Sequence, residues 1–380
     1  MKRIALVYFD AGGGHRNAAM ALEAAIRQSN LPWDVQLVNL QELLDSIDFI
    51  RQYTGLRMQD VYNRMLQNGW TLGSTQLMRV LQGVIRIYHR KTVRLLKEYW
   101  RGLEPDLVVS LIPHFNRALC ESVRGSCPGT PFVTILTDIA DYPPHFWIER
   151  QKQFLICGSK RAAQQAQELG HPEEHIFRTS GMILNPRFYN YSPIDRAAER
   201  TKAGLDATRM TGLVLFGGQG ARKKMLDIDR RLSESGLEIQ LILICGKNER
   251  LLEELRAQAR AIPRLVEGFT TNMPYYMQLA DFFIGKPGPG SIAEALAMGL
   301  PVIVEKNAWT LPQERYNAVW VRENELGLVV RNFDTVVDAV AQLLEPETFA
   351  RFRCNAKKMN NRALFEIPDI LSRILSESNN

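Results

Sequence analysis

Residues 285–304 carry a glycine-rich turn between two short apolar segments, G-K-P-G-P-G-S-I-A-E-A-L-A-M-G-L-P-V-I-V. The apolar segments predict two buried strands with a helix between them. The first backbone amides of such a helix have no partner within it, and they suit a phosphate. Gly288 and Gly290 add no side-chain bulk, and Pro289 between them stiffens the turn. Lys286 adds a positive charge, so the turn predicts an anion-binding site.

Glu294 lies one helical turn after Ser291, on the same face of the expected helix. A carboxylate at this position can accept hydrogen bonds from the two hydroxyls of a ribose. The pattern S-x-x-E is also a capping box, in which Glu294 bonds to the Ser291 amide and binds no ligand. The stretch by itself leaves both interpretations open.

A second glycine loop, D-A-G-G-G-H-R-N at residues 10–17, precedes another expected helix. It fits a dinucleotide fingerprint badly, because Asn17 takes the third glycine position and no acid ends the next strand near Asn39. The distinctive residue is His15, at the mouth of the helix. The helix dipole disfavours its charged form, so a neutral His15 can accept a proton. The alternative is a helix-capping histidine with no chemistry.

Asp138 ends an expected strand in I-L-T-D-I-A-D-Y-P-P-H-F-W. An acid at the carboxyl end of a strand can orient a histidine, although capping the next turn is an equally ordinary role. Asp141, His145 and Trp147 follow on a loop that can meet a substrate. His114 is a weaker candidate.

Several loops in the second half of the chain end further expected strands. Gly217–Gly220 can cradle a phosphate, and Gly246–Asn248 ends a neighbouring strand. In residues 268–274, Phe269 can pack on a base, or it is a core aromatic. The segment L-P-Q-E-R-Y-N at 311–317 offers amides and a carboxylate to the hydroxyls of a sugar. Asp227 and Asp229 spell D-x-D, but within an apparent helix after a basic run, which predicts a surface position.

The composition is that of an ordinary globular protein, with 380 residues, 46% hydrophobic and 23% charged. No apolar run approaches the ~18 residues of a spanning helix, and no secretory signal opens the chain. The five cysteines form no C-x-x-C pair and predict reduced thiols in a cytoplasm. A net charge of +6 favours anionic partners.

Expected strands, loops and helices alternate in two tandem runs, which predicts two doubly wound α/β halves. Residues 182–211 interrupt the pattern with prolines and charges and predict a connection between domains. We expect domains at 1–186 and 187–360 and a polar helical tail at 361–380. Ligands of such sheets bind beyond the carboxyl ends of the strands, so the expected site is a cleft where those ends face each other.

Taken together, these stretches resemble glycosyltransferase family 28, over about residues 4–330. The resemblance is closest to its glycolipid branch of monogalactosyldiacylglycerol synthases and processive diacylglycerol glucosyltransferases. It implies a GT-B fold of two Rossmann-like domains, inverting transfer, a UDP-sugar donor and no metal or other cofactor. The motifs that carry it are G-G-G-H-R at 12–16, G-F-T-T-N-M at 268–273, K-P-G-P-G-S-I-A-E-A-L-A-M-G-L-P at 286–301 and Q-E-x-x-N at 313–317.

The resemblance also implies roles for individual residues. The Gly288–Ser291 turn would hold the diphosphate, Glu294 the ribose and Phe269 the uracil, while Gln313 and Glu314 would bind the hexose. His15 would be the catalytic base or lie beside it, and Asp138 would be an acceptor-side acid. The acceptor-binding set is Gly13, Gly14, His145 and Trp147. The donor-binding set is Gly218, Gln219, Gly220, Gly246, Lys247, Asn248, Phe269, Thr270, Met273, Lys286, Gly288, Pro289, Gly290, Ser291, Glu294, Gln313, Glu314 and Asn317.

The expected function is transfer of a hexose from a UDP-sugar to a lipid hydroxyl, with diacylglycerol as the favoured acceptor and no nucleic-acid partner. The alternatives are a UDP-sugar 2-epimerase, an N-acetylglucosamine transferase to another acceptor and a UDP-sugar-binding sensor; the presence of His15 and Asp138 argues against the sensor. Glucose, galactose and N-acetylglucosamine all remain open as the sugar. Residues 50–101 mix apolar and basic side chains. They predict either a core-facing helix or docking on an anionic membrane surface, at its cytoplasmic face.

Overall fold

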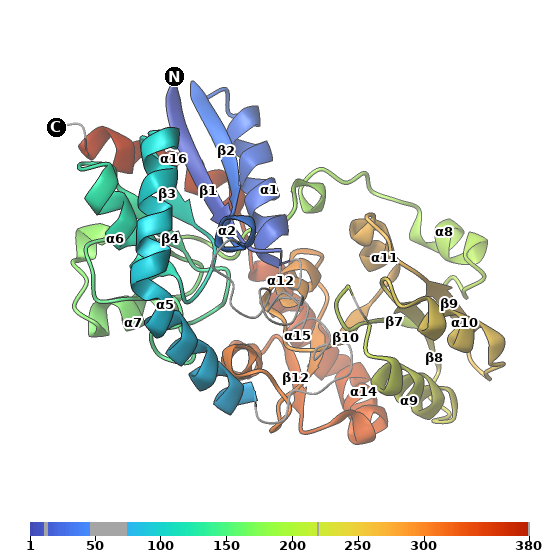
Figure 1. Ribbon diagram of the computed structural model, residues 1–380. Helices are drawn as coiled ribbons and strands as arrows, with labels where there is room; N and C mark the ends of the chain where they lie inside the picture. The colour runs from blue at the N-terminus through green and yellow to red at the C-terminus, as the bar shows by residue number, and fades with distance from the viewer. Residues whose placement is uncertain (11–13, 46–73, 219, 379–380) are drawn as a thin grey trace. The chain divides into compact units, whose positions relative to one another are not determined.

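The computed structural model describes residues 1–10, 14–45, 74–218 and 220–378, and these divide into two compact units (Figure 1). Unit 1 holds the described residues up to 186 together with those from 361 onward. Unit 2 holds residues 187–360. Among the described residues, no helix combines the length and apolarity that crossing a bilayer requires.

Unit 1 is built on a six-stranded sheet in the order β2-β1-β3-β4-β5-β6, in which every neighbouring pair is parallel. The central strands β3 and β4 are fully buried, as expected for a parallel sheet covered on both faces. Their carboxyl ends therefore lie along one edge of the sheet. The strands are β1 (Lys2–Tyr8), β2 (Trp33–Asn39), β3 (Leu107–Ser110), β4 (Phe132–Ile135), β5 (Phe154–Cys157) and β6 (Ile176–Arg178).

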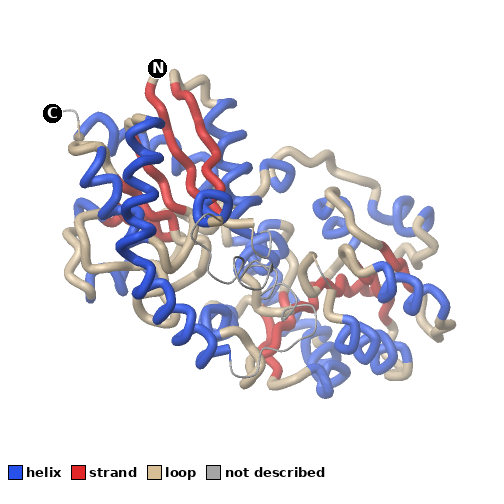
Figure 2. Tube along the Cα trace, in the orientation of Figure 1, coloured by secondary structure: helices blue, strands red, loops and turns tan. Residues whose placement is uncertain are grey.

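Helices cover both faces of this sheet (Figure 2). One core cluster joins the buried side of α1 to α16, which lie side by side in Figure 1. Leu364, Ile367, Leu371 and Ile374 give α16 an apolar stripe at helical spacing, so the expected polar tail is instead an amphipathic helix of unit 1. A second cluster holds α5 and α6. The helices are α1 (Gly14–Gln28), α2 (Leu40–Leu44), α5 (Ser74–Leu103), α6 (Asn116–Ser126), α7 (Lys160–Glu168) and α16 (Ala363–Glu377), with 3₁₀ turns η1 (Glu173–His175) and η2 (Pro186–Phe188).

Unit 2 repeats the arrangement on a second six-stranded parallel sheet, in the order β12-β11-β10-β7-β8-β9. The strands are β7 (Met210–Leu215), β8 (Ile239–Ile244), β9 (Arg264–Glu267), β10 (Phe282–Gly285), β11 (Val302–Glu305) and β12 (Gly327–Val330). The helices are α8 (Arg196–Lys202), α9 (Arg222–Ser233), α10 (Glu249–Ala257), α11 (Met273–Leu279), α12 (Pro289–Ala297), α13 (Arg315–Glu323), α14 (Val336–Leu344) and α15 (Pro346–Lys358), with 3₁₀ turns η3 (Pro312–Glu314) and η4 (Phe333–Thr335).

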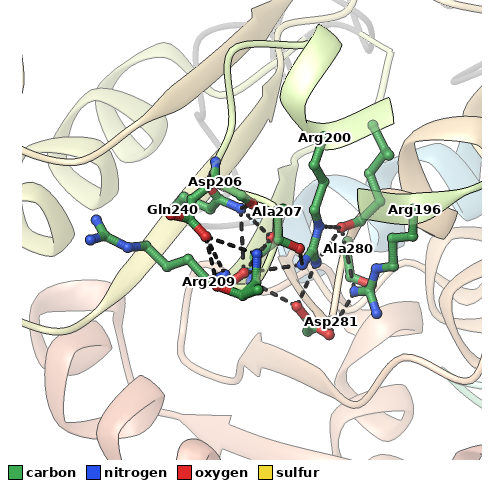
Figure 3. Close-up of polar contacts among 11 residues, drawn as sticks. Arg196, Arg200, Asp206, Ala207, Arg209, Gln240, Ala280 and Asp281 are labelled. Atoms are coloured by element: carbon green, nitrogen blue, oxygen red, sulfur yellow. Dashed lines mark hydrogen bonds and ion pairs between the residues drawn. The ribbon is translucent and has the colours of Figure 1, made fainter. Parts of the chain in front are cut away.

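A buried polar cluster attaches α8 to the amino end of the unit 2 sheet (Figure 3). Arg200, only 3% exposed, donates from Nη2 to Asp281 Oδ2 at 2.7 Å and from Nε to the Leu279 carbonyl at 2.9 Å. Asp281 also accepts from the Thr211 amide at 2.9 Å and from Arg196 at 2.6 Å. Buried charges are tolerated only when they are paired and hydrogen-bonded in this way. Much of the expected inter-domain connection is therefore an anchored part of unit 2, at the edge opposite the ligand loops.

The expected pair of doubly wound parallel sheets is confirmed. The D-x-D prediction is wrong for its second residue, because Asp229 is fully buried. Its Oδ2 atom lies 2.9 Å from Arg260 Nε and 2.7 Å from Arg264 Nη1. Two arginines from later in the chain balance the negative charge of the Asp229 carboxylate. These ion pairs connect α9 to the start of β9.

Candidate active site

His15, the second residue of α1, meets the loop that follows β4. Its Nδ1 atom lies 3.0 Å from Thr137 Oγ1. Protein atoms surround the imidazole ring, although part of the residue stays accessible. This burial lowers the pKa of His15 to about 4, and a hydrogen bond with the Leu111 backbone raises it by a smaller amount. His15 is thus neutral near pH 7, as expected, but burial is the main cause. A neutral imidazole can accept a proton.

Trp147 lies beside this histidine and bonds to Asp138. The Trp147 indole donates to Asp138 Oδ2 at 2.9 Å, and its ring centroid is 5.8 Å from that of His15. Trp147 is fully buried, so it supports the site from within the core and offers no surface to an acceptor. The expectation that Trp147 contacts the acceptor directly does not fit this burial. Asp138 accepts the indole hydrogen bond and so holds the Trp147 ring in place.

Asp141 fixes the loop that carries these residues. Its carboxylate accepts from the backbone amides of Trp147 at 2.7 Å and His145 at 3.0 Å. The Gln165 side chain bonds to both the backbone amide and the backbone carbonyl of Asp141. Burial raises the pKa of Asp141, and the backbone hydrogen bonds oppose that rise. His145 is exposed and remains a candidate for acceptor contact, as does exposed Gly14.

His114 lies on the loop after β3, close enough to His15 to influence its charge. Burial, together with the nearby His15, lowers the pKa of His114 to about 4. Its ring packs edge-on against Phe146 at 4.3 Å. The sequence analysis did not identify Thr137 as a partner of His15. Its place next to Asp138, at the end of a strand, is the one signal that could have suggested it.

In unit 2, α12 begins at Pro289 with Gly288 as its N-cap, two positions earlier than expected. No side chain caps the Gly288 end of this helix. The capping-box interpretation is therefore wrong, because Ser291 lies inside the first turn instead of at the N-cap. Gly290, in the first turn of α12, is exposed. The first backbone amides of α12 lie next to it, where an anion could accept hydrogen bonds from them.

Glu294 lies one turn further along α12. Part of the residue is accessible, yet burial of its carboxyl raises the pKa to about 7. No hydrogen bond joins this carboxyl to another described residue, which distinguishes it from the paired acids elsewhere in the unit. A ligand that donates hydrogen bonds, such as a ribose, would satisfy it.

The Q-E-x-x-N segment contacts the glycine turn directly. Glu314 Oε1 accepts from Lys286 Nζ at 2.7 Å. Asn317, fully buried in α13, donates from Nδ2 to the Pro287 carbonyl at 2.8 Å. The neighbouring Gln313 is half-buried on η3. The structure thus brings together two motifs that the sequence keeps apart.

Gly217, Gly218 and Gly220 pack against the turn that follows β8. Gly246 has a positive φ of 60°, and a Cβ there would lie 2.4 Å from the Gly218 carbonyl oxygen, so only glycine fits. The Lys247 amide donates to the same carbonyl at 2.8 Å. Two of the predicted donor loops therefore touch through their backbones.

The loop after β9 presents Phe269, which is 60% exposed and therefore not a core aromatic. Lys247 Nζ lies 5.4 Å from the centre of its ring, within cation–π range. Thr270 caps the Asn272 amide from the same loop, and Met273 opens α11. Asn248 caps α10 by accepting from the Leu251 amide, so its oxygen is already used.

The predicted residues of unit 2 gather in this way at the carboxyl ends of β7, β8, β9 and β10. Gly13 and Gln219 lie outside the described residues, as does part of the 50–101 segment. Within the described part of the chain, no group of three or more His, Cys, Asp or Glu side chains is arranged to hold a metal ion.

A comparison with known protein families finds a match for the second half of the chain. Residues 212–374 match the glycosyltransferase family 28 C-terminal domain. Residues 212–374 are therefore similar to the C-terminal domain of that family. Monogalactosyldiacylglycerol synthase 1 from Arabidopsis thaliana, a chloroplastic protein, is 27% identical over 376 residues, which cover 91% of this chain and 65% of that relative. The chain thus spans slightly less than two thirds of the relative's length. The predicted family resemblance is confirmed.

Solved structures of similar shape agree on the fold. MurG from Acinetobacter baumannii superposes with a TM-score of 0.66 at 14% identity, covering 98% of this chain and 100% of MurG. A UDP-GlcNAc 2-epimerase from Neisseria meningitidis gives 0.61 at 12% identity, covering 99% and 100%. The fold class is therefore GT-B, as predicted. Because a MurG protein and an epimerase share it, the fold does not choose between transfer and epimerisation.

Proposed function

We propose that this family 28 protein moves a hexose from a UDP-sugar to the hydroxyl group of a lipid acceptor, with inversion at the anomeric carbon. The observation that carries the donor half is the convergence of the α12 amides with Lys286, of the Glu294 carboxyl and of Phe269 at one edge of the unit 2 sheet. A diphosphate, a ribose and a base need those three kinds of group. The similarity to a galactolipid synthase over 91% of the chain supports a lipid such as diacylglycerol as the acceptor.

In the proposed reaction the acceptor hydroxyl attacks the anomeric carbon while neutral His15 takes its proton. The bond between that carbon and the diphosphate oxygen breaks, and UDP leaves. The α12 amides and the Lys286 ammonium stabilise the negative charge that develops on the leaving group. Glu294 accepts hydrogen bonds from the ribose, and Phe269 packs on the uracil.

Product analysis tests this proposal against its alternatives. The full chain is incubated with UDP-glucose, UDP-galactose or UDP-GlcNAc, with and without diacylglycerol or a total lipid extract. Mass spectrometry then identifies the sugars in the nucleotide and lipid fractions. We expect a hexosylated lipid and free UDP only when lipid is present. Conversion of a UDP-sugar without lipid would indicate a 2-epimerase, and transfer restricted to UDP-GlcNAc would indicate an N-acetylglucosamine transferase.

Turnover is expected to survive chelation. The charge of the leaving diphosphate is met by Lys286 and helix amides in the proposed mechanism, so the chain needs no metal or other cofactor. The rate is measured after dialysis against excess EDTA, beside an untreated sample. Loss of activity that magnesium or manganese restores would refute this prediction.

The helix α5 combines a core face with a basic face. The buried apolar residues on its second half are Val93, Leu96 and Trp100, so part of the apolar pattern is explained by packing. Between residues 85 and 94 the exposed residues repeat at helical spacing and are Arg86, Ile87, Arg90, Lys91 and Arg94. Ile87 is 79% exposed among these cations. Such a surface suits the headgroup layer of an anionic membrane, and we propose that α5 docks unit 1 on the cytoplasmic face of one.

Vesicle sedimentation tests the docking. Binding is expected to rise with the fraction of anionic lipid and to fall with salt, because each basic side chain near the surface adds about 1 kcal/mol. Replacing four cations of α5 with glutamine should release the protein. The four residues are Arg90, Lys91, Arg94 and Lys97.

A charge-matched control removes four exposed cations from unit 2, which should leave vesicle binding nearly unchanged. Equal binding of the wild-type protein to neutral and anionic vesicles, or binding to neither, would contradict the docking and favour a soluble acceptor. The control residues are Arg250, Arg351, Lys357 and Lys358.

A further inference from the structure

His15 and Thr137 meet at the carboxyl edge of the unit 1 sheet. His15 lies in the first turn of α1, and Thr137 follows the end of β4 by two residues. The His15 Nδ1 and Thr137 Oγ1 atoms are 3.0 Å apart. Within the part of the chain that the structure describes, this is the only hydrogen bond of the Thr137 side chain. The hydroxyl therefore does not cap a turn, which is a common role of a threonine in a loop.

The backbone at Thr137 is fixed by the sheet and not by its own side chain. The Leu136 amide donates to the Ile156 carbonyl at 3.1 Å. This bond extends the parallel pairing of β4 with β5 by one residue, up to the position before Thr137. Thr137 is half-buried, so part of it lies within the protein surface. Because its backbone is anchored in this way, the hydroxyl can direct the histidine ring that it contacts.

The hydroxyl selects one of two orientations of the His15 ring. These orientations differ by a half-turn about the last side-chain bond, which exchanges nitrogen and carbon positions. In one of them Nδ1 faces Thr137, and in the other a ring carbon would replace it and the hydrogen bond would be lost. Trp147 limits the space beside the ring, with centroids 5.8 Å apart, and Asp138 accepts from its indole at 2.9 Å. The orientation with Nδ1 toward Thr137 is therefore favoured.

The same contact distinguishes the two ring nitrogens chemically. A neutral imidazole has one N–H group, and the hydrogen bond made at one nitrogen determines where that proton lies. Burial lowers the pKa of His15 to about 4, so the ring is neutral near pH 7. Because Nδ1 faces Thr137, Nε2 is the nitrogen left for the acceptor hydroxyl of the proposed reaction. Nε2 can take a proton only if the single N–H is on Nδ1, where the Thr137 oxygen accepts its hydrogen bond.

The contact gains strength when the ring becomes charged. Proton transfer to Nε2 gives an imidazolium with an N–H group on each nitrogen, and the Thr137 oxygen remains an acceptor for the one on Nδ1. Hydrogen bonds from a charged donor are stronger than those from a neutral one. The hydrogen bond with the Leu111 backbone also favours the charged form of His15, because it raises the pKa. Thr137 thus stabilises the ring most in the state that follows proton transfer.

We propose that Thr137 is a positioning residue that orients His15 through Nδ1 and leaves Nε2 to take the proton of the acceptor hydroxyl. This inference rests on the proposed transfer, in which His15 is the base. It also makes a claim about the resting protein that needs no substrate: at neutral pH the ring proton of His15 lies on Nδ1. That claim can be measured without turnover, so it is separable from the proposed function.

Nitrogen NMR of the full chain, labelled with ¹⁵N at histidine, measures the position of the ring proton at pH 7. The chemical shifts of the two ring nitrogens differ according to which of them is protonated. The His15 signals are assigned by their absence from the spectrum of His15→Ala. We expect Nδ1 to be protonated in the wild-type chain and in Thr137→Ser, which keeps the hydroxyl. Thr137→Val keeps the shape but not the hydroxyl, and we expect a mixture of both tautomers.

Steady-state kinetics with a UDP-hexose and diacylglycerol measure the consequence for transfer. Thr137→Val is expected to lower kcat by about ten- to hundredfold, as for a lost hydrogen bond to a charged group, with both KM values changed by less than about twofold. Thr137→Ser should restore most of kcat. In a His15→Ala background, Thr137→Val should change the residual rate by less than about twofold, because the group it positions is gone.

Thr130→Val is the matched control. Thr130 precedes β4 at the opposite end of the same strand, is half-buried like Thr137 and donates its hydroxyl to the Pro105 carbonyl at 3.0 Å. The variant loses one hydroxyl and one hydrogen bond in the same unit. We expect unchanged His15 signals and a kcat within about twofold of the wild-type value. Thermal unfolding monitors all variants, and Thr137→Ala replaces Thr137→Val if the latter does not fold.

Two results would overturn the inference. One is a wild-type spectrum in which Nε2 of His15 carries the proton. The other is a Thr137→Val chain in which both the tautomer and kcat are unchanged, because the hydroxyl would then have no influence on the ring. A wild-type chain that gives the expected spectrum but transfers no hexose would refute the proposed function instead, since the tautomer is a property of the resting protein.

Discussion

Replacing His15 with alanine is expected to lower kcat by about 10²–10⁴-fold while the Kd for UDP stays within about twofold. The loss follows from removing the group that takes the acceptor proton. Donor binding should survive because the proposed UDP contacts all lie in unit 2, whereas His15 belongs to unit 1. Steady-state kinetics and calorimetry with UDP separate the two effects.

The pH profile sharpens this expectation. His15 must be neutral to act as a base, and burial lowers its pKa to about 4. The activity that depends on His15 is therefore present above about pH 4 and lost as the pH falls through that value, well below the ordinary histidine range. His175→Ala, a half-buried histidine of the same unit packed on Phe154, is the control and should leave kcat unchanged. Near-normal turnover of His15→Ala would mean that another residue takes the proton.

Replacing Glu294 with alanine is expected to weaken UDP binding by about 1–3 kcal/mol, the usual range for lost hydrogen bonds to a charged group. The carboxyl has no hydrogen bond to a described residue, so its loss removes a ligand contact and no internal one. Folding stability should not fall. Calorimetry with UDP and urea unfolding measure the two quantities on the same samples. A loss of stability with unchanged UDP affinity would show that Glu294 has a structural role.

Glu294→Gln separates charge from size. Burial raises the pKa of Glu294 from 4.5 to about 7, so between those values the folded chain keeps a proton that the unfolded chain releases. This group's contribution to stability therefore declines as the pH rises through that window. The glutamine variant should be at least as stable as the wild-type chain at pH 8. UDP affinity of the wild-type chain should rise with pH through about 7, and the variant should lack this component.

Much of the fold could be predicted because apolar strands and their loops are local features. The two apolar segments that flank the glycine turn form the buried strands β10 and β11, with α12 between them, as expected. The strands β6 and β12 lie at the edges of their sheets, and most of their residues are only half-buried, so they are harder to predict than the central strands. The C-terminal helix was expected to be polar because its alternating charges mask the apolar stripe that packs against α1.

The glycine turn of the candidate site could be predicted for the same reason, since it is one continuous segment. Contacts between distant segments could not. Nothing in the sequence pairs Thr137 with His15, 122 positions away, or joins Glu314 to Lys286. Sequence reasoning chose Asp138, the neighbour of Thr137, because a carboxylate is a more familiar partner for histidine. Asp229 was expected at the surface because it lies in a helix after a basic run, and its arginine partners, Arg260 and Arg264, come only later in the chain.

The proposed transfer is tested most directly by following a labelled sugar. The full chain is given UDP-hexose with a uniformly ¹³C-labelled hexose, together with diacylglycerol in anionic vesicles, and the lipid fraction is analysed by mass spectrometry. The proposed function predicts a diacylglycerol that has gained one or more labelled hexoses and an equal release of UDP, with both products formed at least about 100-fold more slowly by the His15→Ala variant. Labelled UDP-sugar that is isomerised without lipid, or recovered unchanged with every hexose and lipid supplied, would contradict it.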